Sequence, residues 1–404
     1  MERTILHCDC NSFFASVETV LNPSYRGVPM AVCGSQEDRH GIVLSKNEEA
    51  KHFGIQTAET VHSAKRKCPH LVIAPPHHDE YVKFSKMLNN IYAEYTDCVE
   101  PFGIDESWLD VTASRRIFGS GEEIAEAIRK RVKEEIGVTV SIGVSFNKVF
   151  AKLGSDYKKP DAITVISKDN FKQIVFPLPV SDLLFVGKRT SEELSKIGIR
   201  TIGDLASSSK EMLIHKLGKM GDMLWNYANG LDESPVGSDE EREVKSISNG
   251  FTFKHDLVTR EDCRVGIDFL CEEIGYKLRQ KSLKCNTVAI TIKDTRLKSI
   301  QRQRPLENAS DISREIADLA FKILCDEWDK SCPIRMISVA VTGLVDFSSS
   351  FTQLDLFSDA QTTNRDKEKK KEETVDAIRN RFGSSSILNA SLYNTDIGVG
   401  VKNS

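Results

Sequence analysis

Residues 99–111 have the sequence VEPFGIDESWLDV, in which two apolar runs flank the acidic pair Asp105 and Glu106. Short runs of β-branched and aromatic residues predict strands, here Val99–Phe102 and Ser107–Val111, with the acidic pair at the tip of a hairpin. Acidic pairs on turns are usually solvated. Two carboxylates held together at the end of apolar strands, however, repel each other unless a cation neutralises them. This hairpin therefore carries either an ordinary acidic turn or part of a metal site.

A third acid, Asp9, follows another apolar run. We predict a buried strand over Thr4–Asp9 and a helix over Ser12–Leu21, so that Asp9 can converge with Asp105 and Glu106 on one edge of a sheet. A site with oxygen ligands alone suits Mg²⁺ and not zinc. Two such ions can activate a hydroxyl nucleophile and stabilise a leaving pyrophosphate, which makes these three acids candidate catalytic residues.

The elements around these acids predict an α+β fold. Helices are expected over Tyr81–Tyr95 and Glu122–Ile136, and an alternating strand over Val138–Val144. The order strand–helix–strands–helix–strand fits an antiparallel sheet covered by helices on one face. Residues 170–230 have a helical pattern, and residues 231–244 form an acidic stretch with Pro and Gly, which predicts a linker.

A second β/α unit is expected after residue 245. Its predicted elements are a strand at 246–253, a helix at 260–280, a hairpin at 287–292 and 297–304, a helix at 312–328 and a strand at 336–342. Nine basic residues and one acid lie between Tyr276 and Arg304, although the net charge of the chain is −4. Alternation along the hairpin would place several of these bases on one solvent face. Such a face is either a phosphate-binding surface or simply a solvated one.

The composition describes a folded protein without a membrane anchor. Of the 404 residues, 40% are hydrophobic and 28% are charged, which predicts roughly two to four domains. No apolar run approaches the roughly 20 residues that span a bilayer, and we expect no secretory signal. The ten cysteines include no CxxC pair. We therefore expect reduced thiols in a cytosolic protein rather than zinc ligands or disulfides.

Several stretches of the chain resemble one protein family. They are DCNSFFASVE at 9–18, GIDESWLD at 103–110, SIGVSFNKVFAK at 141–152 and DYKKPD at 156–161. In order and spacing they are similar to the Y-family (translesion) DNA polymerases, on the side of the bacterial polymerase IV and UmuC-like enzymes. The resemblance extends over residues 1–345.

This resemblance implies a right-hand polymerase with palm, fingers, thumb and little finger. The expected divisions are a palm at 1–20 and 76–166, fingers at 21–75, a helical thumb with a helix-hairpin-helix at 167–232, a linker at 233–244, a DNA-binding little finger at 245–346, and a tail at 347–404 with a clamp-binding peptide at 353–357 and a terminal helix. It also implies a cytoplasmic, nucleoid-associated bacterial monomer. Its activity would be low-fidelity, template-directed synthesis from deoxynucleotides on primer–template DNA, past damaged bases.

The resemblance also implies roles for individual residues. Asp9, Asp105 and Glu106 would be the metal ligands, together with the carbonyl of Cys10, for two Mg²⁺ ions that Mn²⁺ can replace. Phe14 would be the steric gate, whose ring leaves no room for a 2′-hydroxyl and so favours deoxynucleotides. The nucleotide-binding residues would be Phe13, Phe14, Ser45, Lys51 and Lys159. For the two phenylalanines the alternative is packing in the core.

The fingers and the thumb depart from the family pattern. Glu48 and Lys51 stand where most relatives have Tyr and Arg on the triphosphate. Lys51 can still supply charge, without the bidentate fork of Arg, but no role follows for Glu48. Asn11 replaces a frequent second Asp, and Phe185 stands where the thumb hairpin usually has its first Gly.

Three further groups of residues follow from the resemblance. The roof over the nascent base pair would be Val32, Ile42, Leu44 and Ala58, and simple packing is the alternative for Ile42 and Leu44. The DNA contacts would be Lys148, Lys152, Gly187, Lys245, Lys293, Arg296, Lys298, Arg302 and Arg304. The peptide that docks on the bacterial sliding clamp (beta subunit) would be Gln353, Leu354, Leu356 and Phe357. Apolar side chains in a polar tail favour burial by a partner, and packing back on the little finger is the alternative.

Two other classes of function fit part of this pattern. A palm-fold nucleotidyl cyclase also uses two metal ions held by carboxylates, but it has no use for the basic hairpin, the thumb-like segment or the clamp-like peptide. A non-catalytic DNA-binding accessory factor leaves the carboxylates without a role. A template-directed polymerase accounts for all of these features.

Overall fold

The protein is described by a computed structural model that covers residues 2–35, 39, 41–237, 244–329, 331–346, 359–383, 386–392 and 395–399, without the side chains of 359–364. The chain divides into two compact units. The first contains Met1–Gly34 and Ile42–Arg242, and the second contains Ser35–Gly41 and Glu243–Ser404. Among the described helices, none is long and apolar enough to cross a membrane.

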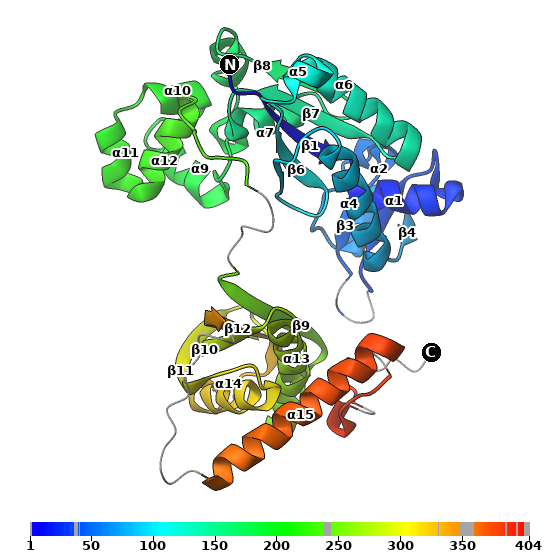
Figure 1. Cartoon of the computed structure of the whole chain (residues 1–404), viewed down its shortest axis with the longest axis vertical. Helices are drawn as coiled ribbons and strands as arrows, with labels where there is room; N and C mark the ends of the chain where they lie inside the picture. Colours follow the sequence, from blue (N-terminus) through cyan, green and yellow to red (C-terminus); the bar gives the residue numbers. More distant parts are fainter. Residues whose placement is uncertain are drawn as a thin grey trace. The chain divides into compact units, whose positions relative to one another are not determined.

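A five-stranded sheet forms the centre of the first unit (Figure 1). Its order is β5 (Val99–Pro101), β6 (Glu106–Asp110), β1 (Ile5–Cys10), β7 (Val140–Ser145) and β8 (Ile163–Ile166). Strand β1 is antiparallel to both β6 and β7, whereas β8 is parallel to β7. The expectation of a wholly antiparallel sheet was therefore wrong. The chain passes from β7 to β8 through a helix, and such a crossover produces a parallel pair.

Helices cover both faces of this sheet, not one face as the sequence led us to expect. Helix α7 (Lys148–Tyr157) lies so close to one face that a Cβ at Gly143 of β7 would overlap the carbonyl oxygen of Ala151. On the other face, α4 (His78–Ala93) and α6 (Gly121–Arg131) share a hydrophobic core with β1 and β7. Because both faces are covered, β7 is buried at all six positions and does not alternate.

The segment that follows α1 (Phe13–Leu21) contains a small three-stranded sheet. Its order is β3 (Val43–Lys46), β2 (Met30–Cys33) and β4 (Val72–Ala74). Two short helices, α2 (Glu48–His52) and α3 (Val61–Lys67), begin at Asn47 and Thr60, whose side chains cap the first turn. A further short helix of this unit, α5 (Arg115–Phe118), follows β6.

The helical part of the first unit contains α8 (Phe171–Val175), α9 (Lys188–Lys196), α10 (Ile202–Ser207), α11 (Lys210–Leu217) and α12 (Lys219–Ala228). Phe185, in the turn before α9, has φ +68°. Glycine adopts this left-handed conformation more readily than a residue with a side chain does. The first residues of the expected linker pack against the rest of the first unit. Arg3 donates a hydrogen bond to the Ser234 carbonyl (2.6 Å), and Val236 is buried.

The second unit is a four-stranded antiparallel sheet with two helices (Figure 1). The sheet order is β11 (Ser299–Ser310), β10 (Leu283–Asp294), β12 (Ile334–Asp346) and β9 (Ser246–Leu257). Helices α13 (Arg260–Gln280) and α14 (Ser313–Glu327) share one core with the sheet. The terminal helix α15 (Asp359–Phe382) is attached to this unit through Arg279, which binds the carboxylates of Glu372 and Asp376.

Candidate active site

The three acids singled out in the sequence lie together on one edge of the central sheet. Asp9, near the end of β1, pairs directly with Glu106, the first residue of β6. Asp105 precedes it, and its carbonyl accepts a hydrogen bond from the Cys10 amide (3.0 Å). Asp9 is buried, with 8% of its surface exposed. The predicted convergence of the first strand and the hairpin is thus observed.

Two lysines compensate this negative charge. Lys152, on α7, lies 2.6 Å from Glu106 and 3.3 Å from Asp9. Lys159, just after α7, lies 2.8 Å from Asp9. Both ammonium groups also pair with Asp156, at 3.5 and 2.7 Å. Lys152, one of the expected DNA contacts, lies within the carboxylate cluster.

The pKa values of Asp105 and Glu106 are shifted in opposite directions. Burial, followed by the charges of Asp9 and Glu106, raises the pKa of Asp105 to about 6. Burial alone would also raise the pKa of Glu106, but hydrogen bonds from His7 and Lys152 and the Lys152 charge lower it to about 2. Asp105 is therefore the acid with the least compensation, as expected where a further cation binds.

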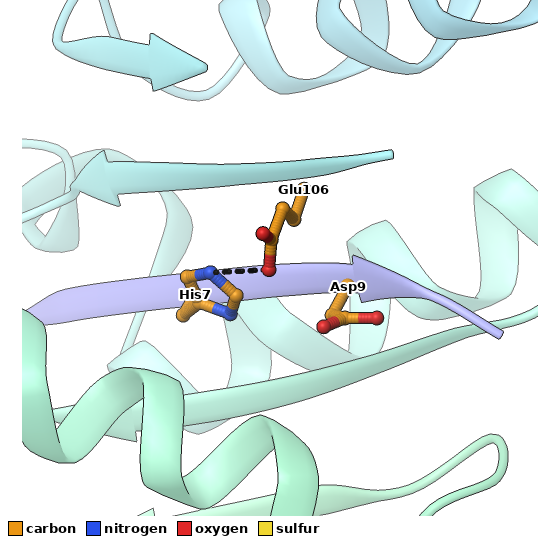
Figure 2. Close-up of side chains that lie close together, drawn as sticks. All are labelled: His7, Asp9 and Glu106. Atoms are coloured by element: carbon orange, nitrogen blue, oxygen red, sulfur yellow. Dashed lines mark ion pairs between the residues drawn. The ribbon is translucent and has the colours of Figure 1, made fainter. Parts of the chain in front are cut away.

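His7 belongs to the cluster and was not singled out in the sequence. It precedes Asp9 by two residues on β1, so both side chains lie on the same face of the sheet, as Figure 2 shows. Its Nε2 is 3.4 Å from Oε2 of Glu106, and its Nδ1 is 2.8 Å from Oγ of Ser155. Among the described residues, His7, Asp9 and Glu106 are the one group whose ligand atoms lie close enough to hold a metal ion. The spacing of two along a buried strand is the signal that points to His7.

The expected nucleotide-binding residues lie around the start of α1. Phe13 is buried in the core, which fits the packing alternative, whereas Phe14 is partly exposed. The Ser45 hydroxyl accepts a hydrogen bond from the Ala15 amide (3.4 Å) in the first turn of this helix. Lys51 is 2.5 Å from Glu48. The two residues that depart from the family pattern therefore form an ion pair with each other.

The four expected roof residues have different environments. Val32 is fully buried in a small core with Ala15 and Met30. Ile42 and Ala58 are exposed, and Leu44 is partly exposed. Ala58 has φ +68°, and its amide donates to the carbonyl of Val43 (2.8 Å).

Most of the expected DNA contacts already have partners in the protein. Lys148 is 2.6 Å from Glu100 and lies over the ring of Trp108. On the hairpin, Arg302 and Arg304 stand opposite Ile290 and Val288, two core residues, and therefore point to the helix-covered side of the sheet. Their partners are Glu327 (3.0 Å) and Asp326 (2.7 Å) at the end of α14.

Both arginines thus share one face of β11, and their side chains remain 54% and 37% exposed. Arg296 pairs with Asp294 (3.1 Å). Lys245 and Lys298 are exposed, Lys293 is partly exposed, and Gly187 precedes the first turn of α9. The four residues of the clamp-like peptide, Gln353, Leu354, Leu356 and Phe357, lie outside the described residues.

Three family models match segments of this chain. Residues 8–156 match the impB/mucB/samB family, residues 244–356 match the C-terminal domain of that family, and residues 181–232 match the thumb domain of DNA polymerase-iota. The chain is also 50% identical over 388 residues to the DNA polymerase IV of Acetivibrio thermocellus, with 96% of each chain covered. This combination of identity and coverage decides the family.

The chain belongs to the bacterial Y-family DNA polymerases. A second relative, the DNA polymerase IV of Clostridium kluyveri, is 36% identical over 396 residues, which cover 97% of this chain and 98% of the relative. The solved structure titled "Y-family DNA polymerase chimera Dbh-Dpo4(243-245)-Dbh" matches with a TM-score of 0.76 and 24% identity, over 85% of this chain and 99% of that one. This likeness confirms the expected right-hand α+β fold.

This Y-family polymerase is a DNA-directed DNA polymerase. Membership of the family assigns it template-directed DNA synthesis and a role in translesion synthesis. Its substrates are primer–template DNA and deoxynucleotides, and its activity depends on a divalent metal ion. The edge of the central sheet, with its acids and lysines, is therefore the candidate active site.

Proposed function

We propose that this Y-family polymerase transfers nucleotides by a two-metal mechanism at Asp9, Asp105 and Glu106. The observation that supports this most directly is the convergence of Asp9 on β1 with Asp105 and Glu106 at the start of β6, together with the pKa of Asp105 raised to about 6. Carboxylates held close together favour binding of a divalent cation, because the cation relieves their mutual repulsion. The backbone carbonyl of Cys10, at the end of β1, would complete the ligand set.

The donor set fits Mg²⁺. The three assigned side chains offer only hard oxygen ligands, which Mg²⁺ prefers, and Mn²⁺ accepts the same ligands. When bound, two such ions favour loss of the primer 3′-hydroxyl proton and stabilise the charge on the leaving pyrophosphate. Asp9, Asp105 and Glu106 would hold the ions at a rigid sheet edge.

Other residues of the site act on the incoming nucleotide. We assign Lys159 to the triphosphate, because its ammonium lies at Asp9 and its side chain is long enough to turn toward a phosphate. Backbone amides at the start of α1 provide further donors for phosphate oxygens. Ser45 and Lys51 line the same region. The ring of Phe14 would lie under the sugar and exclude a 2′-hydroxyl, while Ile42, Leu44 and Ala58 would face the base pair.

The rest of the molecule would hold the primer–template and a processivity partner. We assign residues 1–20 with 76–166 to a palm, 21–75 to fingers, 167–232 to a thumb and 245–346 to a little finger. Gly187, at the start of α9, and Lys245, Lys293 and Lys298 would contact phosphates, which supplies affinity without reading sequence. We further propose that the polymerase acts as a monomer and that residues 353–357 dock on the sliding clamp.

Primer extension tests the metal assignment. Asp105→Asn should abolish extension with Mg²⁺ and four deoxynucleotides while leaving DNA binding in a gel-shift assay unchanged, because it removes a ligand charge without changing size. The matched control is Asp97→Asn, which changes an exposed acid two residues before β5. This variant should extend primers at the normal rate. Extension by Asp105→Asn at the parental rate would rule out the assigned site.

A further inference from the structure

We propose that Phe185 is a DNA-contacting residue, whose ring packs against a deoxyribose of the strand that has a phosphate at Gly187. This inference rests on the proposed DNA contact of Gly187 and adds to it an apolar contact made by a side chain. It starts from an unusual combination at one position. Phe185 is 51% exposed, and its backbone has the left-handed φ of +68°.

The conformation of Phe185 is unfavourable for a residue with a side chain, because in the left-handed region the Cβ approaches the following carbonyl oxygen too closely. Its neighbours Leu183 and Val186 are buried in the core of the helical part and fix the course of this turn. The Phe185 ring lies 6.3 Å from that of Tyr227, centroid to centroid, near the outer limit of an aromatic contact. Burial of the ring therefore offsets little of the strain, and strain kept at an exposed residue indicates a function.

Gly187, two residues further along, shows the opposite arrangement. Its φ is −78°, which any residue adopts, and a Cβ built on it would meet no atom of the described residues within 4 Å, its chain neighbours apart. Neither its conformation nor its packing requires a glycine. The open space does let another molecule approach the backbone amides at the start of α9. The turn thus has a ring where the backbone favours glycine, and no side chain where one would fit.

The charges beside this turn indicate that the other molecule is an anion. Lys188 and Arg189, in the first turn of α9, are exposed, and no acid accompanies them in that turn. Positive side chains at a helix N-terminus are unfavourable beside the positive end of the helix dipole, and a bound anion removes this cost. The phosphates of primer–template DNA, the substrate of this polymerase, supply such an anion.

An aromatic ring beside a bound phosphate would contact the adjoining sugar. Phosphates and sugars alternate along a strand, and two residues of the protein span at most about 7 Å. A phosphate at Gly187 would therefore bring the apolar face of a neighbouring deoxyribose to Phe185. A contact with the sugar carries no sequence information. It suits an enzyme that must hold any primer–template.

DNA binding by the full-length polymerase tests this inference. Phe185→Gly removes the ring and relieves the backbone, so the affinity for a primer–template, measured by fluorescence anisotropy, should fall about three- to tenfold. This factor corresponds to burial of roughly half of a Phe side chain. The melting temperature should rise, because glycine tolerates the positive φ. Phe185→Tyr keeps the ring and should bind DNA normally, as should the control Ile117→Ala, which removes a 79% exposed apolar side chain on α5.

Two further measurements identify the cause of a lower affinity. Phe185→Asn also tolerates the left-handed conformation, and it should lose as much affinity as Phe185→Gly. Parental affinity in the Asn variant would show that the flexibility of glycine, and not the missing ring, weakens binding, and would overturn the proposal. The slope of the logarithm of affinity against the logarithm of salt concentration should stay parental, because an apolar contact releases no counterions. A shallower slope would mean that a phosphate contact is lost instead.

The outcomes separate this contact from the proposed function. Gly187→Ala places a methyl group in the space that the phosphate would use, and should weaken DNA binding by itself. Parental affinity in Phe185→Gly together with weaker binding in Gly187→Ala would refute the role of Phe185 alone. Parental affinity in both variants would refute the DNA contact of the whole turn. A lower melting temperature in Phe185→Gly with parental affinity would show that the ring serves stability, and would also overturn the proposal.

Discussion

The ring of Phe14 stacks on the ring of Tyr81, with centroids 4.1 Å apart and planes inclined by 11°. The position of the Tyr81 ring is fixed by a hydrogen bond, because its hydroxyl donates to Oε1 of the buried Glu18 (2.5 Å). The same oxygen lies 2.9 Å from Nδ1 of His77. The proposed steric gate, Phe14, therefore packs against Tyr81 of α4, which is itself hydrogen-bonded to Glu18 of α1.

Removal of the gate should relax sugar selection. In Phe14→Ala the ring is lost, so a ribonucleotide fits and the preference for deoxynucleotides should fall at least about tenfold, which corresponds to roughly 1.4 kcal/mol. Single-turnover insertion of matched deoxy- and ribonucleotides measures this ratio. Phe13→Leu is the control, since Phe13 packs in the core and its replacement should affect stability and not selectivity. Unchanged selectivity in Phe14→Ala would remove the gate assignment.

The support behind the gate should matter for stability and, to a smaller degree, for selectivity. Tyr81→Phe keeps the stacking with Phe14 but removes the hydroxyl that donates a hydrogen bond to Glu18, a buried acid. Loss of one partner of a buried polar group costs about 1–3 kcal/mol. Thermal unfolding of the first unit should shift down accordingly. Sugar selectivity should decline less than in Phe14→Ala, and a larger decline would mean that the hydroxyl itself acts on the sugar.

Strands and helices with a clear hydrophobic period were predictable from the sequence. Helix α13 was expected at 260–280 and is observed at Arg260–Gln280. That a helix also covers the second face of the central sheet was not predictable. The evidence for it is the close contact between Gly143 of β7 and Ala151 of α7, which becomes visible only in three dimensions. A fully buried strand such as β7 also has no alternation that reveals which side faces a helix.

The acids of the active site were predictable because each ends or begins an apolar strand. The charges around them were not. Lys152 is a base on an amphipathic helix, and sequence alone cannot tell whether it faces DNA or the carboxylate of Asp9, 143 residues away in the chain. Arg302 shows the same difficulty, since its strand register and its partner Glu327 become visible only in the folded sheet.

Metal binding should depend on pH through Asp105. Its pKa is raised to about 6, so a proton must leave before a cation binds, and apparent Mg²⁺ affinity should fall as the pH drops below 6. Calorimetric titration at pH 5.5 and 8 in two buffers with different ionisation enthalpies measures the released protons. Proton release should occur at pH 5.5 and be nearly absent at pH 8. Equal release at both values would contradict the assignment.

The stability of the metal-free protein should respond to the same group. Because the folded pKa of Asp105 lies above the usual Asp value near 3.8, protonated Asp105 favours the folded state. This contribution is complete below about pH 4 and is lost as the pH rises through about 6. Asp105→Asn stays neutral at every pH. Its metal-free form should therefore lack this component of the change in melting temperature between pH 4 and 7, whereas Asp97→Asn should retain it.

Replacement of the two large apolar residues of the clamp-like peptide should separate clamp binding from catalysis. Leu356→Ala with Phe357→Ala removes side chains that each contribute roughly 1.5–3 kcal/mol when buried by a partner. Affinity for a bacterial sliding clamp, measured by surface plasmon resonance, should fall by more than tenfold. Distributive primer extension without the clamp should be unchanged. Equal clamp affinity would show that the peptide is not the docking site.

The terminal helix should depend on one arginine for its attachment. Arg279, with an 11% exposed side chain, is 2.6 Å from Asp376, also contacts Glu372, and donates to the carbonyl of Asp311 (2.9 Å). Arg279→Ala would leave two largely buried acids without their shared cation, which costs about 3 kcal/mol. Hydrogen exchange of α15 should then accelerate strongly, whereas the exposed Arg381→Ala should leave it unchanged. Parental protection of α15 in Arg279→Ala would mean that apolar packing, rather than this ionic contact, holds the helix in place.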